Sequence, residues 1–395
     1  MTAPALPIPG LSRQGPLHWH SGWSPGHVTR AFLLATVPIV AAGLVLFGRA
    51  AAGVLCCSIL GAVLGELLVF YITPQGPRRK LGFAALTGIL LGLTLPVTVP
   101  WHIPFLGGLV AVAVGQGLLG GFGNYLWQPA LVGWAVLHLV FGAQLAPRTW
   151  PVLAAHRLWS GSIQAAAEVA YYRGYQWTRP PYGVDAWALQ RPIDLLILNY
   201  GSSLGEGGVS EAGWLELFRD RLPPWRDTLW GTVGGGIGET CTLALALGGL
   251  YLTYRGLPRW RAVTAALLTV AMLAAVLPIR LDDRLLWLPV FSFPEQFPAG
   301  PAWVLFHLTG DGLLLSCLIL AADPMTTPLM PRGNILFGVG VGVLTMTARW
   351  FGLTPGSSYW AILAMNALVP VIDRFTRRRG RGAAWRWLLQ SRQPP

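Results

Sequence analysis

Apolar stretches long enough to cross a lipid bilayer recur along most of this 395-residue chain. A helix needs about 20 apolar residues to cross the hydrocarbon core. The hydrophobic runs predict helical spans near 31–48, 51–73, 82–96, 103–121, 128–145, 232–252, 261–279, 302–322, 334–348 and 358–374. The runs at 82–96 and 334–348 are short for a complete crossing. The pattern predicts an all-α integral membrane protein with about ten transmembrane helices.

Charged residues are too few for a soluble protein. They make up 11% of the chain, against about 25% in an average soluble domain, and 53% of the residues are hydrophobic. Most of the chain must therefore avoid water, which excludes a soluble enzyme. No nucleophile–base arrangement is visible either, so we predict no catalytic residues of hydrolytic type.

The net charge is +12, and the positions of the basic residues predict how the chain is oriented in the membrane. Basic residues gather before the first predicted span, after the second, sixth and eighth spans, and in the tail: Arg13, Arg30, Arg78, Arg79, Lys80, Arg255, Arg259, Arg261, Arg332, Arg374, Arg377, Arg378, Arg379, Arg381, Arg386 and Arg392. The opposite short loops hold Arg49, Arg349 and a mixed-sign segment at 280–284. The positive-inside rule places both termini in the cytoplasm. Contact with anionic lipid explains the basic charge of the tail, and we expect no nucleic-acid partner.

The chain is predicted to have five parts. They are a cytoplasmic segment 1–30, a transmembrane half 31–145, an external, periplasmic cap 146–230, a second transmembrane half 231–375 and a basic cytoplasmic tail 376–395. The cap holds eight Arg and eight Asp or Glu with several Trp and Tyr, a composition typical of a folded segment.

The two halves share a proline motif. Pro96–Pro100 and Pro324–Pro328 both read Pro-x-Thr-x-Pro, and they are offset by 324 − 96 = 228 residues. Each motif ends the third span of a five-span unit, and an odd number of spans inserts the second unit upside down. The sequence therefore predicts a 5+5 inverted repeat with broken helices. Prolines that merely kink two continuous helices are the alternative.

Four carboxylates lie within or at the ends of apolar spans: Glu66, Glu239, Asp311 and Asp323. Charged groups at membrane depth are costly and are functional candidates for that reason. We predict that these four residues belong to an ion pathway. The alternative is a structural role, such as hydrogen bonding between helices or capping of a broken helix, which suits Asp323 beside Pro324.

The histidines indicate no metal site. His138 and His307 lie inside predicted spans, where packing is the expected role. His18, His20 and His27 are close in sequence, but no cysteine or carboxylate accompanies them.

Several short motifs resemble those of the NqrB/RnfD family. They are Gly120–Asn124 with Pro129, Ala130 and Gly133; Gly238, Glu239 and Thr240; Asp323–Pro328 with Pro331, Arg332 and Gly333; and Met365, Asn366 and Ala367 with Pro370, Asp373 and Arg374. The order is collinear over roughly residues 30 to 378. The short central loop is more similar to RnfD than to NqrB.

The resemblance implies a membrane subunit of a multisubunit redox complex in the bacterial inner membrane. Such complexes pass electrons between ferredoxin and NADH, or from NADH to quinone, and couple the transfer to Na⁺ or H⁺ translocation. It further implies partner subunits, both membrane-embedded and peripheral, and a role for Gly238, Glu239 and Thr240 in binding a cofactor.

The family's covalent flavin site is altered in this chain. Relatives carry FMN esterified to a threonine that follows an aspartate, and the collinear stretch here holds Asp185, Arg191 and Pro192, with Arg191 at the threonine position. A guanidinium cannot form this ester, but it suits a phosphate. The resemblance therefore implies a flavin, FMN or riboflavin, that is non-covalent if it is bound.

Two other functions remain open from the sequence. An inverted repeat also supports a channel or carrier for a small solute, and the chain could be a flavin-free structural subunit. The coupled ion, the electron donor and acceptor, and the stoichiometry of the complex are not specified by these patterns.

Overall fold

A computed structural model describes residues 25–72, 81–118, 125–145, 150–151, 188–189, 193, 225–231, 233–257, 260–281, 284–288, 299–352 and 355–376. The protein is mostly helical over these residues, as predicted for a membrane protein of this composition. Short strands, of two or three residues each, occur in connections between helices and were not predicted.

The first group of helices comes from the N-terminal half. It contains α1 (Pro25–Ile72), α2 (Leu81–Thr94), α3 (His102–Val112), the π-helix η1 (Ala113–Leu118) and α4 (Pro129–Leu145). Gly48 interrupts α1 with a φ of 58°, a conformation that glycine adopts without steric cost. The two parts of α1 match the first two predicted spans.

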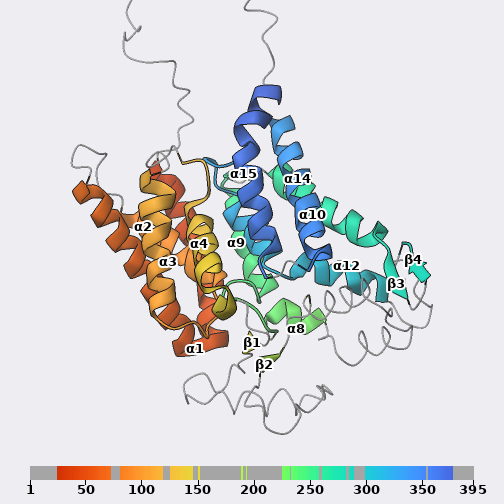
Figure 1. Ribbon diagram of the computed structural model, residues 1–395, viewed down its shortest axis with the longest axis horizontal. Coiled ribbons are helices and arrows are strands. Elements are labelled where there is room, and N and C mark those ends of the chain that lie inside the picture. Colours follow the sequence, from red (N-terminus) through yellow and green to blue (C-terminus); the bar gives the residue numbers. More distant parts are fainter. Residues whose placement is uncertain are drawn as a thin grey trace, which may run out of the picture.

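The second group comes from the C-terminal half. It contains α8 (Trp225–Trp230), α9 (Thr242–Tyr254), α10 (Trp260–Val276), α12 (Ala299–Thr309), α13 (Leu313–Leu315), the π-helix η4 (Ser316–Leu320), α14 (Pro331–Trp350) and α15 (Ser357–Thr376). The strand pairs are both antiparallel: β1 (Trp150–Pro151) with β2 (Ala188–Leu189), and β3 (Ile279–Leu281) with β4 (Arg284–Leu286). Figure 1 shows the two groups of helices side by side.

Each predicted span contains a helix, but two spans differ from the prediction. The span at 232–252 begins late, because the glycine-rich residues 233–241 form turns and α9 starts at Thr242. The span at 302–322 is broken after α12, where Asp311 and Gly312 have φ values of 55° and 64°. Both departures place a carboxylate in non-helical backbone, Glu239 in the first and Asp311 in the second.

Length and hydropathy identify long and short apolar helices. Among the described residues, Gly26–Ile72 is the one helix that alone is long and apolar enough to cross a membrane. The pair Gly300–Thr309 and Leu313–Leu320, bent by 55°, qualifies when it is taken as one span. Shorter apolar helices occupy Leu81–Thr94, His102–Leu118, Pro129–Leu145, Thr242–Tyr254 and Trp260–Val276.

Glycines bring helices into close contact in both halves. A Cβ atom at Gly65 of α1 would lie 2.9 Å from the Leu109 carbonyl oxygen of α3, and one at Gly342 of α14 would lie 2.9 Å from the Ala266 carbonyl oxygen of α10. Small residues allow this approach between membrane helices. One buried apolar cluster contains residues of both groups, so the halves share a core.

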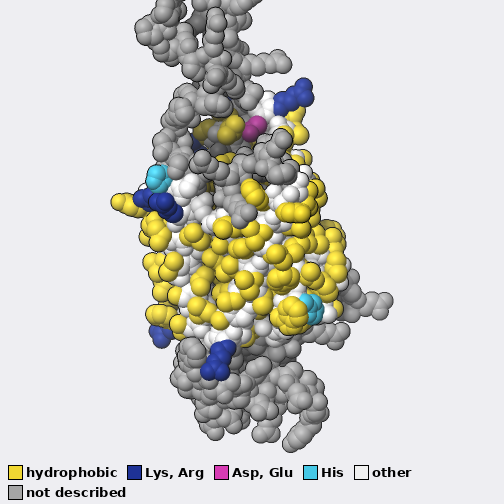
Figure 2. Space-filling model, turned by 90° about the vertical axis from the view of Figure 1, so that its left-hand side faces the viewer, with side chains coloured by type: hydrophobic (Ala, Val, Ile, Leu, Met, Phe, Trp, Pro, Cys, Tyr) yellow, Lys and Arg dark blue, Asp and Glu magenta, His cyan; other side chains and the backbone are white. Residues whose placement is uncertain are grey.

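The outer surface of the first group is apolar. Figure 2 shows a broad band of hydrophobic side chains on this face, with Lys and Arg toward its two ends. Exposed apolar residues of α1 contribute to the surface: Leu34, Val37, Val45, Leu60, Leu64 and Leu68. A continuous apolar surface of this kind is expected where a helix faces lipid.

Candidate functional site

The segment before α9 is bound to the end of α2. The backbone N–H of Ile237 donates to the Leu95 carbonyl oxygen at 3.1 Å, and that of Gly238 donates to the Leu93 carbonyl oxygen at 2.8 Å. Carbonyl groups at a helix C-terminus lack partners within the helix. The contact therefore satisfies the end of a helix in the first half with an unwound segment of the second half, and it places Glu239 at the junction.

Glu239 is hydrogen-bonded to the first turn of α15. Its Oε1 atom accepts from the Tyr359 hydroxyl at 2.5 Å, and its Oε2 atom accepts from the Gly236 N–H at 3.1 Å. Glu239 is 9% exposed and Tyr359 is 1% exposed. A short bond to a carboxylate in such surroundings is of the strong, charge-assisted kind.

Asp311 caps the N-terminus of α15. Its Oδ1 atom accepts from the Gly356 N–H at 2.6 Å, and its Oδ2 atom accepts from the Ser357 N–H at 2.8 Å and from the Ser357 hydroxyl. The Ser358 hydroxyl donates to the Asp311 carbonyl oxygen at 2.9 Å. Unpaired N–H groups and the helix dipole both favour a negative charge at this position.

Arg349, in the last turn of α14, lies beside Asp311 and is 1% exposed. Its Nη1 donates to the His307 carbonyl oxygen at 2.6 Å, its Nη2 to the Gly310 carbonyl oxygen at 2.9 Å, and its Nε to the Ser357 hydroxyl at 3.2 Å. Nε is 4.0 Å from Asp311 Oδ2. The guanidinium therefore joins the end of α12 to the start of α15, where it complements the negative end of one helix dipole and a buried carboxylate.

Asp323 belongs to a second polar cluster, which follows the π-helix η4. Its Oδ2 accepts from the Tyr125 hydroxyl at 2.8 Å, and its Oδ1 accepts from the Met325 N–H at 3.0 Å. The Asn366 amide of α15 lies between the two halves, and it pairs with both when its nitrogen faces the Thr326 carbonyl oxygen, at 3.0 Å, and its oxygen faces the Gln128 nitrogen, at 3.3 Å. Both proline motifs adopt turns, the first after the end of α2 at Thr94 and the second after the end of η4 at Leu320.

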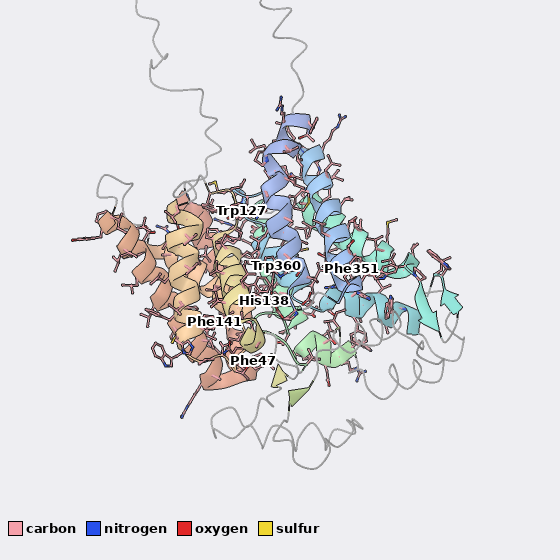
Figure 3. All side chains as sticks on the ribbon, in the orientation of Figure 1. Phe47, Trp127, His138, Phe141, Phe351 and Trp360 are labelled. Atoms are coloured by element: carbon pink, nitrogen blue, oxygen red, sulfur yellow. The ribbon has the colours of Figure 1, made fainter. Side chains whose placement is uncertain are left out.

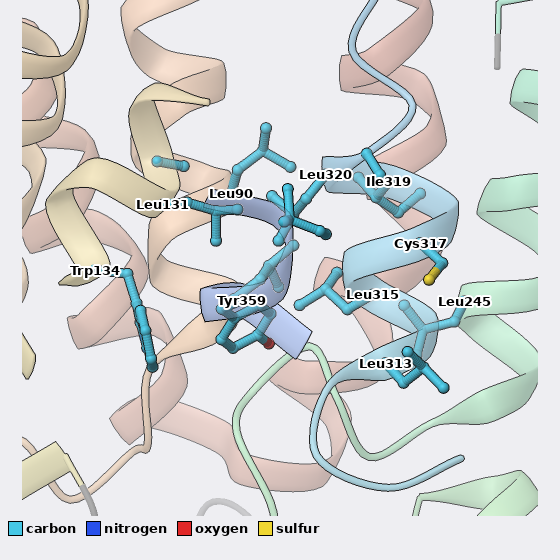
Figure 4. Packing of buried hydrophobic residues seen from close by; sticks show 14 of the residues in the cluster. Leu90, Leu131, Trp134, Leu245, Leu313, Leu315, Cys317, Ile319, Leu320 and Tyr359 are labelled. Atoms are coloured by element: carbon cyan, nitrogen blue, oxygen red, sulfur yellow. The ribbon is translucent and has the colours of Figure 1, made fainter. Parts of the chain in front are cut away.

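Aromatic rings fill the contact between α4 and α15. The Trp134 ring stacks on His138, with centroids 4.9 Å apart, and meets Tyr359 edge-on at 5.0 Å. Figure 3 places His138 and Trp360 between these two helices, and Figure 4 shows the Tyr359 hydroxyl directed away from Trp134. The rings hold the Tyr359 side chain so that its hydroxyl reaches Glu239.

The structure brings together two of the four predicted carboxylates. Glu239 and Asp311 both contact the first turn of α15. Asp323 is in the second cluster, and Glu66, near the C-terminal end of α1, takes no part in the hydrogen bonds of either cluster given above. Thr240 lies beside Glu239 and is buried. Asp185, Arg191 and Pro192 lie outside the described residues, so their role remains a prediction.

The position of Arg349 differs from the one predicted from the placement of charges. The pattern put it in a loop, but it lies inside the protein and holds the junction of α12, α14 and α15. In the sequence, Arg349 stands out as an arginine at the end of an apolar run, on the predicted external side, where other basic residues are few. Tyr359 and Ser357 were not predicted. Ser357 and Ser358 after Gly356 are typical of a helix start but do not indicate a buried partner, and a single tyrosine has no distinctive spacing.

Comparisons with known proteins agree with the resemblance. A profile described as the NQR2, RnfD, RnfE family matches residues 13–382. The chain is 34% identical over 350 residues to the D subunit of an ion-translocating oxidoreductase complex of Stutzerimonas stutzeri, covering 88% of this chain and 90% of that protein. It is 30% identical over 344 residues to the D subunit of a proton-translocating ferredoxin:NAD(+) oxidoreductase complex of Clostridium ljungdahlii, covering 87% and 88%. It is 27% identical over 362 residues to the D subunit of a Na(+)-translocating ferredoxin:NAD(+) oxidoreductase complex of Acetobacterium woodii, covering 92% of each.

Proposed function

We propose that this chain, which belongs to the NQR2, RnfD, RnfE family, is the D-type membrane subunit of a multisubunit oxidoreductase complex. The complex couples electron transfer between ferredoxin and NAD to the translocation of Na⁺ or H⁺. The observation that carries this proposal is the extent of the similarity, which covers 88% of this chain and 90% of the Stutzerimonas stutzeri relative.

The architecture of the proposal is a 5+5 inverted repeat of ten membrane helices. Equivalent pairs of helices pack together in the two halves: the second part of α1 against α3, and α10 against α14. The next pairs, α3 with α4 and α14 with α15, are equivalent as well. Unwound segments and helix ends at the junction are typical of inverted repeats that bind ions near the midplane.

The proposed topology has both termini in the cytoplasm and the segment 146–230 outside. In Figure 1 the C-terminal end of α15 lies at the top of the view, whereas α8, β1 and β2, which belong to this segment, lie at the bottom. Reporter fusions at Lys80 and after Arg381 should be cytoplasmic, and one near Gly208 external. A cytoplasmic reporter at Gly208 would overturn both the topology and the inverted repeat.

Of the four predicted carboxylates, Glu239 at the junction and Glu66 are proposed to serve the ion pathway, whereas Asp311 and Asp323 are proposed to hold the helix ends around it. The buried charge around α15 supports this proposal, because burying ionisable groups at membrane depth is costly unless they act on an ion or stabilise one another. Arg349 offsets the charge of Asp311, so Glu239 is the stronger candidate for a group that exchanges its charge.

A flavin in this subunit, FMN or riboflavin, is proposed to be held without a covalent bond. Ile193, two residues after Arg191, lines one cavity together with Glu239 and Thr240. We expect Arg191 to pair with the flavin phosphate, because a guanidinium suits the geometry of a phosphate. The denatured chain should show no flavin fluorescence in a gel, and a fluorescent band whose flavin peptide maps to 184–196 would contradict this expectation.

The experiment that tests the function is reconstitution of the complete complex in proteoliposomes. Reduced ferredoxin with NAD should drive ion uptake that an ionophore abolishes. A complex without this chain should lose the uptake. Uptake at the full rate in its absence would show that the translocation path lies in other subunits.

A further inference from the structure

The break between α12 and α13 lies against the hydrogen bond that joins Tyr359 to Glu239. A Cβ atom at Gly312 would lie 2.8 Å from Glu239 Oε1 and 2.7 Å from Tyr359 Cζ, and it would lie closer still to the Tyr359 hydroxyl oxygen. Non-bonded carbon atoms ordinarily pack about 3.5–4.0 Å apart. A side chain at position 312 therefore cannot occupy this space while the hydrogen bond is made.

Backbone conformation is only part of the reason for a glycine at this position. Gly312 has a φ of 64°, but Asp311, the residue before it, has a φ of 55° and carries a side chain. Aspartate is one of the residues that tolerate this left-handed conformation. The Asp311 carboxylate extends to the N-terminus of α15, whereas the space beside Gly312 is filled by the pair of Tyr359 and Glu239. The position therefore requires glycine for space as well as for conformation.

A second glycine borders the other oxygen of the Glu239 carboxylate. The Gly236 N–H donates to Oε2 at 3.1 Å, and a Cβ atom at Gly236 would lie 3.0 Å from Glu239 Cδ. Glycine backbone thus borders both carboxylate oxygens, from the segment before α9 and from the break after α12. The α15 helix supplies the Tyr359 hydroxyl to Oε1, so three separate segments meet at this one carboxylate.

We propose that Gly312 is a positioning residue of the ion pathway, because the absence of a side chain there lets the Tyr359 hydroxyl hold Glu239 in place. The inference rests on the function proposed above and deepens it. The turn that caps α15 through Asp311 also sets the position of Glu239 through the adjacent Gly312. A displacement of this turn therefore displaces the pair of Tyr359 and Glu239 as well.

Gly312→Ala tests the proposal in the complete complex, reconstituted in proteoliposomes and driven by reduced ferredoxin and NAD. Loss of the hydrogen bond between Tyr359 and Glu239 should lower ion uptake per assembled complex by roughly two- to tenfold. Gly256→Ala is the matched control. Gly256 has a φ of 70°, and a Cβ atom there would meet no other atom within 4 Å. The control introduces the same kind of backbone strain without a clash, and it should keep the wild-type uptake.

A double variant distinguishes positioning from a general effect on folding. Tyr359→Leu removes both the hydroxyl and the Cζ atom that a side chain at 312 would contact. Adding Gly312→Ala to Tyr359→Leu should therefore change the abundance of the complex and its uptake by less than about twofold, because two residues that act through one contact do not have additive effects.

Two results would overturn the role of Gly312 and leave the proposed function standing. One is wild-type uptake in Gly312→Ala. The other is a loss of abundance or uptake on adding Gly312→Ala that is as large in the Tyr359→Leu background as in the wild type, because Gly312 would then act independently of Tyr359. Absence of redox-driven uptake in the wild-type complex would refute the proposed function, and this inference with it.

Discussion

Asp311 and Glu239 contact the same turn of α15, yet their surroundings differ. Asp311 lies at the N-terminus of this helix, with the Arg349 guanidinium 4.0 Å away. Glu239 accepts hydrogen bonds from two neutral donors, the Tyr359 hydroxyl and the Gly236 N–H, beside a cavity. The helix dipole and the guanidinium both stabilise the Asp311 carboxylate at the start of α15. We therefore infer a structural role for Asp311, and we propose Glu239, which the Tyr359 hydroxyl and the Gly236 N–H hold in position, as the carboxylate of the ion pathway.

Arg349→Met should have the largest effect. The substitution leaves the charge of Asp311 buried and removes the donors to the His307 and Gly310 carbonyl oxygens. Breaking a buried pair in this way costs about 3–5 kcal/mol, so we expect little folded protein in membranes, as measured by quantitative immunoblotting after mild detergent extraction.

Arg332→Met is the control for that substitution, because Arg332 lies exposed on the same helix. It should accumulate as the wild type does. Normal abundance of Arg349→Met would mean that Asp311 does not depend on the guanidinium, and the distinction between the two carboxylates would then fail.

Glu239→Gln should lower redox-driven ion uptake per assembled complex. The side-chain volume and the acceptor for Tyr359 are retained, while the charge and the acceptor for the Gly236 N–H are lost, so uptake is normalised to the abundance of the complex. We expect a decrease of about tenfold or more, equivalent to roughly 1.4 kcal/mol of ion binding, measured in proteoliposomes with reduced ferredoxin and NAD.

Glu66→Gln tests the other predicted pathway residue outside the two clusters, and we expect the same direction of change. Wild-type uptake in both variants would make these carboxylates structural. The ion path would then have to be sought in the partner subunits.

Tyr359→Phe should have an intermediate effect. It removes the hydroxyl that donates to Glu239 and keeps the ring that packs against Trp134. A typical hydrogen bond contributes about 0.5–1.5 kcal/mol, so ion uptake should fall by roughly two- to tenfold, with normal abundance. Uptake equal to that of the wild type would show that the Tyr359 hydroxyl does not position Glu239 for transport.

Asp323→Asn should have the smallest effect on transport and should act on assembly. An asparagine accepts through one oxygen, so it cannot serve both Tyr125 and Met325 as Asp323 does. We expect about 1 kcal/mol of destabilisation, seen as a lower yield of complex, with normal uptake per assembled complex. A loss of uptake at normal yield would place Asp323 with Glu239 instead.

The apolar pattern alone determined the positions of the helices in both halves. Long runs of hydrophobic residues cannot remain in water, and in lipid they must satisfy their backbone groups internally, which leaves the helix as the available structure. The prolines of the Pro96–Pro100 and Pro324–Pro328 motifs correctly predicted where helices end. The apolar pattern could not predict that 233–241 is unwound, because glycine and apolar residues also occur within membrane helices.

Tertiary structure decided which charged groups meet. Arg349 and Asp311 are 38 residues apart (349 − 311), and Tyr359 and Glu239 are 120 apart, so no local spacing relates them. Their contact depends on α12 breaking at Asp311 and on α15 beginning beside that break, with Trp134 of the other half holding the Tyr359 ring. The sequence could identify carboxylates that are costly in a membrane, because that cost belongs to each residue separately. Their charge partners are set by the packing of helices that are distant in the chain, and only the folded structure specifies this packing.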